Sequence, residues 1–215
     1  LINFWLRLII LFIVSGLLIF MVVLEVIVSK KSLGETSKKI IHQLRICLQG
    51  LLITYLYGGF ADIFFFAILS YRATRKATTL TIINIIVSVL FIVITVAALV
   101  THNWLIRKYQ NIKNDQEKFK EFESKIEGVK ILWKDYKKHS FLEMNALCFA
   151  VAHNILFCFI LAILYEHTLA QVILINILSL IMISYLLWFR PFDEKREFIQ
   201  TIILEAILFA VNICL

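Results

Sequence analysis

The chain has 215 residues, of which 61% are hydrophobic and only 17% charged, and its formal net charge is +7. Soluble domains contain about half apolar and a quarter charged residues, so this composition excludes an ordinary soluble protein and indicates a membrane protein. One proline and six glycines favour long helices over turn-rich sheet, and the alternating pattern of a transmembrane barrel does not occur. The predicted fold class is all-α, a polytopic bundle of transmembrane helices.

Six apolar stretches are long enough to cross a bilayer, which takes roughly 20 helical residues. The predicted spans lie near residues 2–28, 46–71, 79–101, 141–165 and 169–189, and a sixth begins near 198 and is truncated at Leu215. Because both ends of the chain lie in or next to apolar runs, we interpret it as a fragment of a larger polypeptide. The expected organisation is three spans in 1–101, a basic linker in 102–140 and three further spans in 141–215.

Lysine and arginine are distributed unevenly between the two predicted sides of the membrane. Since successive spans alternate in direction, the connections 29–45, 102–140 and 190–197 share one side, and they carry eighteen of the 22 basic residues. Basic connections are typical of the cytoplasmic side. We therefore expect these connections to be cytoplasmic, or on the matrix side of a mitochondrial membrane, with the N-terminal end of the first span outside. This bias explains the net charge without nucleic acid as a partner.

The linker contains an apolar stripe at spacings of three and four residues, which is typical of an amphipathic helix. The stripe consists of Phe119, Phe122, Ile126, Val129, Trp133 and Tyr136, and lysines that include Lys130 and Lys134 fill much of the remaining surface. We expect a cytoplasmic amphipathic helix over 119–136. Its apolar face contacts either a lipid surface with anionic headgroups or a protein partner, and both alternatives stay open.

Several polar residues fall inside the predicted spans, where ionisable side chains are costly and indicate function by default. The candidates are Arg7, Asp62, His153, Asn176 and Glu205. Arg7 and Asp62 have similar predicted depths, so they form either a structural ion pair or, for Asp62, a contact with a permeating cation. The other three, together with Asn154, are predicted to form a hydrogen-bonded seam that serves either as packing contacts or as an ion relay.

Signatures of catalysis are missing from the sequence. It has no G-x-S-x-G, H-E-x-x-H or phosphate-binding loop motif. Its four cysteines are scattered singly in apolar surroundings, so neither a zinc site nor a redox dithiol is expected. We predict that the protein is not an enzyme and that it has no cofactor and no metal site.

A family resemblance is found in the C-terminal part of the chain. WFRPF at 188–192 ends an apolar span, the charged stretch DEKRE follows at 193–197, and Glu205 lies one to two turns into the next span. Together with KIEGVK at 125–130, this order resembles the transient-receptor-potential-like multi-pass membrane proteins of fungi and ciliates, over residues 119–215. The chain departs from that pattern at the start of the fourth span, where it has Glu143 and no arginine, and in the charged stretch, which lacks an asparagine.

What the resemblance implies is a channel-like membrane region, with cations as the expected ions. The alternative is a structural anchor or accessory subunit that packs within a larger membrane complex and transports nothing. The expected partners are the lipid bilayer, anionic headgroups and other membrane protein subunits.

Overall fold

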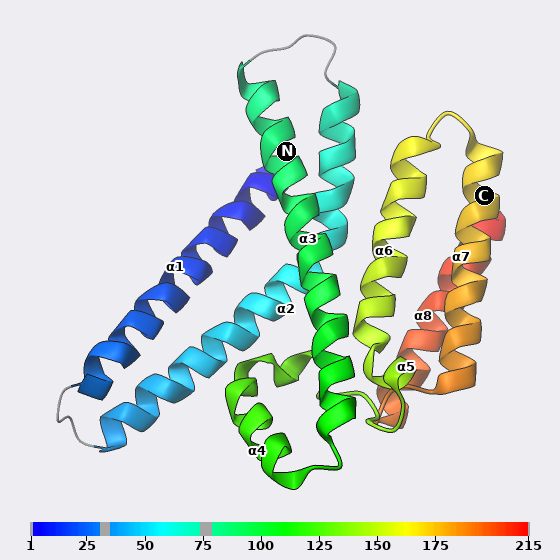
Figure 1. Ribbon diagram of the computed structural model, residues 1–215. Helices are drawn as coiled ribbons and strands as arrows, with labels where there is room; N and C mark the ends of the chain where they lie inside the picture. The colour runs from blue at the N-terminus through cyan, green and yellow to red at the C-terminus, as the bar shows by residue number, and fades with distance from the viewer. Residues whose placement is uncertain (1, 31–34, 74–78, 215) are drawn as a thin grey trace. The chain divides into compact units, whose positions relative to one another are not determined.

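The computed structural model describes residues 2–30, 35–73 and 79–214, which are helical over most of their length (Figure 1). Six helices of this described part are long and apolar enough to cross a membrane. The elements are α1 (Ile2–Lys30), α2 (Glu35–Ala73), α3 (Thr79–Ile112), α4 (Gln116–Lys125), the 3-10 helix η1 (Glu127–Leu132), α5 (Phe141–Met144), α6 (Ala146–Ile163), α7 (Thr168–Phe189) and α8 (Lys195–Cys214). The all-α fold and the six predicted spans are confirmed.

Two of the membrane helices are longer than the sequence predicted. The helix α2 begins at Glu35 instead of near residue 46, and α3 continues to Ile112 instead of ending near residue 101. The length of an apolar stretch determines which part of a helix can lie in lipid. The helix itself can extend further, because polar residues form the same backbone hydrogen bonds in water. The connection predicted over 29–45 is therefore largely helical, and an acidic side chain at Glu35 suits the positive end of the α2 dipole.

The linker is not the single amphipathic helix predicted over 119–136. The helix α4 starts behind Asp115, whose carboxylate accepts a hydrogen bond from the Lys118 backbone N–H at 3.3 Å. It ends at Lys125, and η1 follows. A Cβ atom placed on Gly128 would lie 2.1 Å from Gln49 Oε1, so the backbone of η1 approaches α2 at a distance that only glycine allows. This tertiary contact, together with the low helix propensity of glycine, outweighs the tendency of the periodic pattern to form one continuous helix.

The fourth predicted span, 141–165, also has an interruption. Ser140 and Glu143 form a reciprocal capping box, with the Glu143 N–H donating to Ser140 Oγ at 3.2 Å, and this starts the short helix α5. The continuous part of the span, α6, begins only after Asn145. The capped turn and the following Asn145 separate a surface segment from the helix that enters the membrane.

Contacts divide the chain into two compact units, and each is described by itself. The first unit comprises residues 1–59 and 112–132, which contain α1, the larger part of α2, α4 and η1. The second comprises residues 60–111 and 133–215, which contain the end of α2, most of α3, and α5 to α8.

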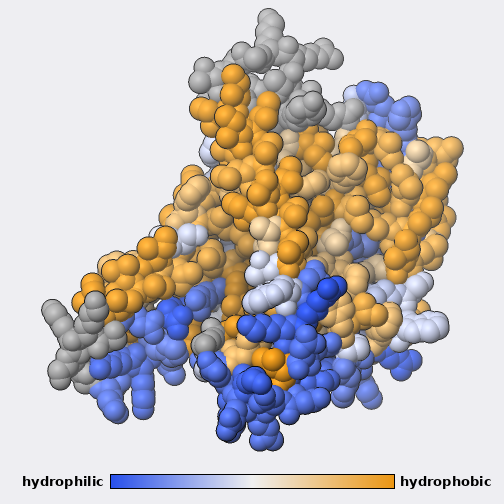
Figure 2. All heavy atoms as spheres, viewed as in Figure 1, coloured by the Kyte–Doolittle hydropathy of each residue, from blue (hydrophilic) through white to orange (hydrophobic). Residues whose placement is uncertain are grey.

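Within the second unit, α7 packs against both α6 and α8 (Figure 1). Its buried residues are Ile175, Ser179, Met182 and Leu186, whose spacing of four, three and four places them on one helix face. Figure 2 shows mostly hydrophobic residues along the visible faces of α6 and α7, with hydrophilic ones gathered at their ends. Such apolar outer faces are suited to lipid, as expected for membrane spans.

The turn between α7 and α8 is formed by the R-P-F sequence. The helix α7 ends at Phe189, and Arg190 adopts a left-handed conformation with φ 44° and ψ 59°. Its N–H still donates to the Leu186 carbonyl oxygen at 2.9 Å, which satisfies one of the last carbonyls of α7. Pro191 follows and cannot continue the helix. The membrane turn predicted from these residues is confirmed.

The end of the linker is hydrogen-bonded to this turn. The Lys137 N–H donates to the Pro191 carbonyl oxygen at 2.7 Å, and the Asp193 N–H donates to the Asp135 carbonyl oxygen at 3.1 Å. Tyr136 lies between these two bonds, and its burial, followed by the nearby negative charge of Asp135, raises the pKa of the phenol to about 12. Tyr136 is therefore neutral at every physiological pH, and it contributes to this junction as a packed aromatic side chain.

Candidate functional site

Two ionisable side chains meet inside the second unit, at the middle of their helices. His153 lies on α6 and Glu205 on α8, and the atoms His153 Nε2 and Glu205 Oε2 are 3.7 Å apart. The two side chains are 8% and 15% exposed. Ionisable groups inside a membrane are rare because their charged forms are costly there. The structure thus brings together two of the five residues predicted for a polar path, and we take them as the centre of the candidate site.

The chain path places both residues at the same depth in the helix bundle. His153 lies ten residues before the last residue of α6, and Glu205 lies ten residues after the first residue of α8. Between them in the chain, Ser179 lies ten residues before the end of α7. At 1.5 Å per residue, each of these positions is about 15 Å from a helix end, which is near the middle of a bilayer of ordinary thickness.

Amide and hydroxyl groups surround this depth of the bundle. Asn154 Oδ1 lies 3.4 Å from His153 Nδ1. Ser179 is completely buried, and neither its Oγ nor Asn176 Oδ1 has a hydrogen-bond partner among the described residues. Asn154, His153 and Glu205 are neighbours, whereas Asn176 Oδ1 makes no hydrogen bond to them, so the predicted seam stays a prediction.

The other predicted pair cannot be evaluated in the same way. The side chain of Arg7 lies outside the described part of the structure, so its pairing with Asp62 remains a prediction. Asp62 lies on α2, close enough to Cys158 of α6 to interact with it electrostatically. Phe64 of α2 also contacts Phe159 of α6, with ring centroids 6.3 Å apart. The end of α2 thus belongs to the same packed region as the first of the two ionisable residues.

A polar junction between α3 and α6 was missed by the sequence reasoning. The Asn145 amide donates to Asn103 Oδ1, and the Asn103 amide donates to Cys148 Sγ at 3.3 Å. Asn145 is only 3% exposed. These residues lie near the predicted ends of spans, where a polar residue is usually solvated. Only the interruption of the helix at Asn145, which the sequence analysis did not anticipate, would have indicated a buried role.

The linker stripe was expected to contact lipid or a partner, and the structure corrects this for three of its members. Phe122, Ile126 and Trp133 are 8%, 9% and 2% exposed, because they pack against the protein itself. Phe119 is half-buried, and Lys130 pairs with Glu123 at 2.9 Å, which leaves Lys134 as the exposed lysine of the predicted set. The apolar side of the linker is mainly an internal surface.

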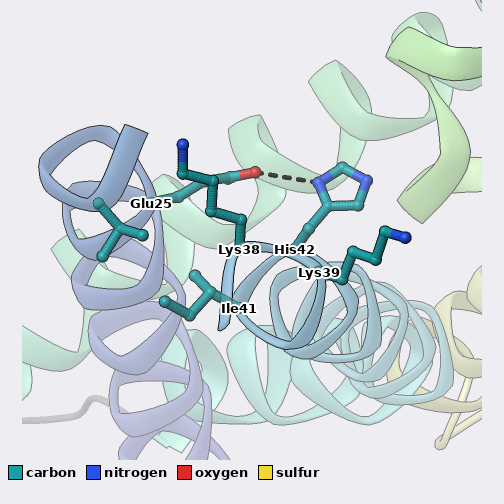
Figure 3. Close-up of a pocket in the computed structure, with 6 residues that line it drawn as sticks. Glu25, Lys38, Lys39, Ile41 and His42 are labelled. Carbon is teal, nitrogen blue, oxygen red and sulfur yellow. Dashed lines mark hydrogen bonds and ion pairs between the residues drawn. The ribbon is translucent and has the colours of Figure 1, made fainter. Parts of the chain in front are cut away.

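A charged cluster connects α1, α2 and η1 within the first unit. Arg45 Nε lies 2.7 Å from Glu25 Oε2, and His42 Nδ1 lies 2.9 Å from Glu25 Oε1. On its other side, His42 Nε2 lies 3.6 Å from Glu127 Oε2. Figure 3 shows Glu25 on α1 facing His42 on α2, and these residues line a pocket together with Val28, Lys38, Lys39 and Ile41. The cluster therefore fixes the end of α1 and the start of η1 to the same face of α2.

We expect Glu25→Gln to lower the free energy of unfolding by about 1 kcal/mol, because the Arg45 and Glu25 side chains are 23% and 32% exposed and water screens their attraction. The loss should shrink as the salt concentration rises. Thermal unfolding in detergent at two ionic strengths measures it. Glu194→Gln, which removes an exposed carboxylate, is the matched control, and an equal loss in both variants would show that the cluster contributes nothing specific.

No group of three or more His, Cys, Asp and Glu side chains that could hold a metal ion is found among the described residues. The pair of His153 and Glu205 supplies only two such ligands. What this pair and its amide neighbours can do is hold a proton, a water molecule or a passing ion.

The comparisons with known proteins decide the family. The family model described as "Transient receptor potential (TRP) ion channel" matches residues 1–215. The chain belongs to the TRP ion channel family. Neither a curated protein nor a solved structure matches it. The resemblance seen in residues 119–215 is confirmed, and the family match extends it over the first three spans as well.

Membership in the TRP family has two direct consequences. This is a family of channels and not of enzymes, in agreement with the missing catalytic motifs. The TRP-family chain is also an integral multi-pass membrane protein, as the six membrane-length helices require. The turn at 188–192 carried the resemblance. Its residues also form backbone hydrogen bonds, Pro191 with Lys137 of the linker and Arg190 with Leu186 of α7.

Proposed function

We propose that this TRP-family chain is the membrane region of a cation channel. The observation that carries the proposal is the buried pair of His153 and Glu205 at mid-depth, because packing alone does not require two ionisable side chains there. In this proposal the polar path also includes the other residues predicted from the sequence, namely Arg7, Asp62 and Asn176. Asp62 supplies negative charge that favours cations over anions, and Glu205 adds to it when its carboxyl group is ionised.

The proposed orientation places the basic connections on the cytoplasmic side. Two sets of contacts support a common side for these connections. Within the first unit, His42 at the start of α2 lies 3.6 Å from Glu127 of the linker. Within the second, Lys137 of the linker is hydrogen-bonded to Pro191 of the α7–α8 turn. The excess of lysine and arginine in these segments favours the inner leaflet, where anionic headgroups are the proposed lipid partners of exposed residues such as Lys134.

A second candidate function is that of a structural anchor or accessory subunit that conducts nothing. The observation in its favour is the exposed apolar surface of α1 and α8, since α8 has no buried residue in the described structure. Bulky side chains such as Phe12 and Leu204 are 70% and 67% exposed, which suits lipid or the surfaces of other membrane subunits. Under this reading, the polar residues stabilise helix packing only.

Ion flux through the full-length protein separates the two functions. If the chain conducts, we expect Asp62→Asn to lower the preference for cations, because it removes a negative charge from the proposed path, while the amount of assembled protein is unchanged. Glu205→Gln should do the same at alkaline pH, where the wild-type carboxyl group has lost its proton. The measurement is the reversal potential in reconstituted bilayers, with Glu194→Gln as a control that removes an exposed carboxylate outside the path. Unchanged selectivity combined with poorer assembly would favour the structural function instead.

A further inference from the structure

The geometry of the pair on α6 and α8 sets limits on its state of protonation. The distance of 3.7 Å between His153 Nε2 and Glu205 Oε2 is longer than a hydrogen bond, because a separation of about 3.6 Å is already too long for one. Neither atom has another hydrogen-bond partner among the described residues. Among the described residues, each of the two atoms therefore faces only the other. A proton can reside on either one.

The second nitrogen of the imidazole is already occupied. His153 Nδ1 lies 3.4 Å from Asn154 Oδ1, an acceptor that favours a proton on Nδ1. The remaining nitrogen, Nε2, is then the one that exchanges a proton, and it is the one that faces Glu205. The amide of Asn154 thus orients the ring for a reaction with the carboxylate.

Burial limits how many exchangeable protons the pair can hold. With one proton, the pair is either an imidazolium beside a carboxylate or a neutral imidazole beside a carboxylic acid, and in both forms the net charge is zero. With none, the pair carries one negative charge, and with two it carries one positive charge. A net charge is costly at 8% and 15% exposure in the middle of a membrane helix bundle, so both of those states are disfavoured.

The neighbouring groups do not remove this preference. On α7 the polar residues near this depth, Asn176 and Ser179, are uncharged. On α2 and α6 the ionisable groups of the same packed region are Asp62 and Cys158. Neither supplies a positive charge that would stabilise an unprotonated Glu205.

We propose that His153 and Glu205 together form a proton-binding site in the α6–α7–α8 bundle, and that this site holds one exchangeable proton at neutral pH. The proton moves between Nε2 and Oε2 without any other bond changing. When it leaves to water, a carboxylate and a neutral imidazole remain. Ser179, which is completely buried and has an unpartnered Oγ, is a further polar group on α7, the helix that packs against both α6 and α8.

The proton site adds a regulatory role to the channel function proposed above. Only its expected effect on ion flux depends on that function. Loss of the proton places a negative charge in the proposed path. Cation selectivity is therefore expected to increase as the pH rises. The presence of the proton itself does not depend on conduction.

The proton can be observed directly in the full-length protein in lipid nanodiscs. Nitrogen-15 NMR of labelled histidine reports the protonation of each imidazole, and infrared spectroscopy with labelled glutamate reports protonated carboxyl groups. His153→Gln and Glu205→Gln assign the two signals, and the exposed His139 of the linker is the internal reference for an ordinary histidine. Wild-type spectra alone decide the outcome if a variant fails to fold.

We expect one proton to remain on the wild-type pair between pH 5 and 8. In Glu205→Gln we expect this exchangeable proton to be absent, because the carboxylate that shares it is gone. Loss of the proton from the wild-type pair within this range, or its retention in Glu205→Gln, would overturn the proton site. A retained proton with selectivity that does not change with pH would support the site and contradict only its role in the channel.

Discussion

Trp133→Ala is expected to lower the free energy of unfolding by about 3–5 kcal/mol, the range of large aromatic side chains removed from a packed interior. Trp133 is 2% exposed, and its ring contacts Tyr109 of α3 with centroids 5.9 Å apart and an angle of 57° between the rings. It lies where the linker leaves η1 and begins to run toward the α7–α8 turn. Alanine would leave a cavity at this point, because the tryptophan ring is almost completely buried.

The chain contains a matched control for this substitution. Trp188, near the end of α7, is 84% exposed in the protein, so Trp188→Ala removes a side chain of the same type without opening a cavity. We expect its effect to remain within about 0.5 kcal/mol. Denaturant-induced unfolding of both variants in the same detergent measures the difference. Equal losses for the two tryptophans would mean that Trp133 is not a packing centre of the protein.

The membrane spans could be predicted because one physical quantity, apolar length, decides them. The middle of each predicted span is helical in the structure. The boundaries were less accurate: α2 starts about a dozen residues early and α3 ends about a dozen late, whereas the continuous helix of the fourth span starts only at Ala146. Lipid determines which residues lie in the bilayer, whereas the ends of helices depend on capping and on contacts in water. Hydropathy carries no information on capping or on contacts in water.

The linker shows how tertiary contacts override a periodic pattern. Its apolar residues were spaced for one helix, and three of them, Phe122, Ile126 and Trp133, are buried. However, burial against the chain itself requires the segment to follow the shape of its neighbours. It does so by changing from α4 to the 3-10 helix η1 after Lys125, which brings Gly128 close to α2. Without knowledge of Gln49 as the neighbour, nothing in the spacing distinguishes a continuous helix from a broken one.

The residues of the candidate site could be predicted from the sequence, but the contact between them could not. Ionisable residues in apolar spans are visible in any sequence, and this identified His153 and Glu205. Their proximity depends on the length of the connections between α6, α7 and α8, which places residues 52 positions apart at one depth. The amides Asn103 and Asn145 were overlooked because they lie at predicted span ends, where a buried hydrogen bond has no sequence signal.

Gly128→Ala is the second substitution for which we expect a large effect, a loss of about 1–3 kcal/mol typical of overpacking. The new Cβ would lie 2.1 Å from Gln49 Oε1 and 2.9 Å from Gln49 Cβ. The amide end of Gln49 can move to another rotamer, but its Cβ is fixed to α2. Either η1 or α2 must therefore shift. Limited proteolysis of the linker and thermal unfolding should both report the loosened contact.

Two further variants show whether this contact is the cause. Gly50→Ala adds the same methyl group on the opposite side of the same interface, where it meets Ile131 Cδ1 at an ordinary 3.7 Å, and it should be neutral or stabilising because alanine favours the helix. Gln49→Ala shortens the side chain that Gly128→Ala would strike, so the double variant should recover part of the lost stability. If Gly50→Ala were as harmful as Gly128→Ala, or if the double variant showed no recovery, the close approach of η1 to α2 would not be what breaks the linker helix.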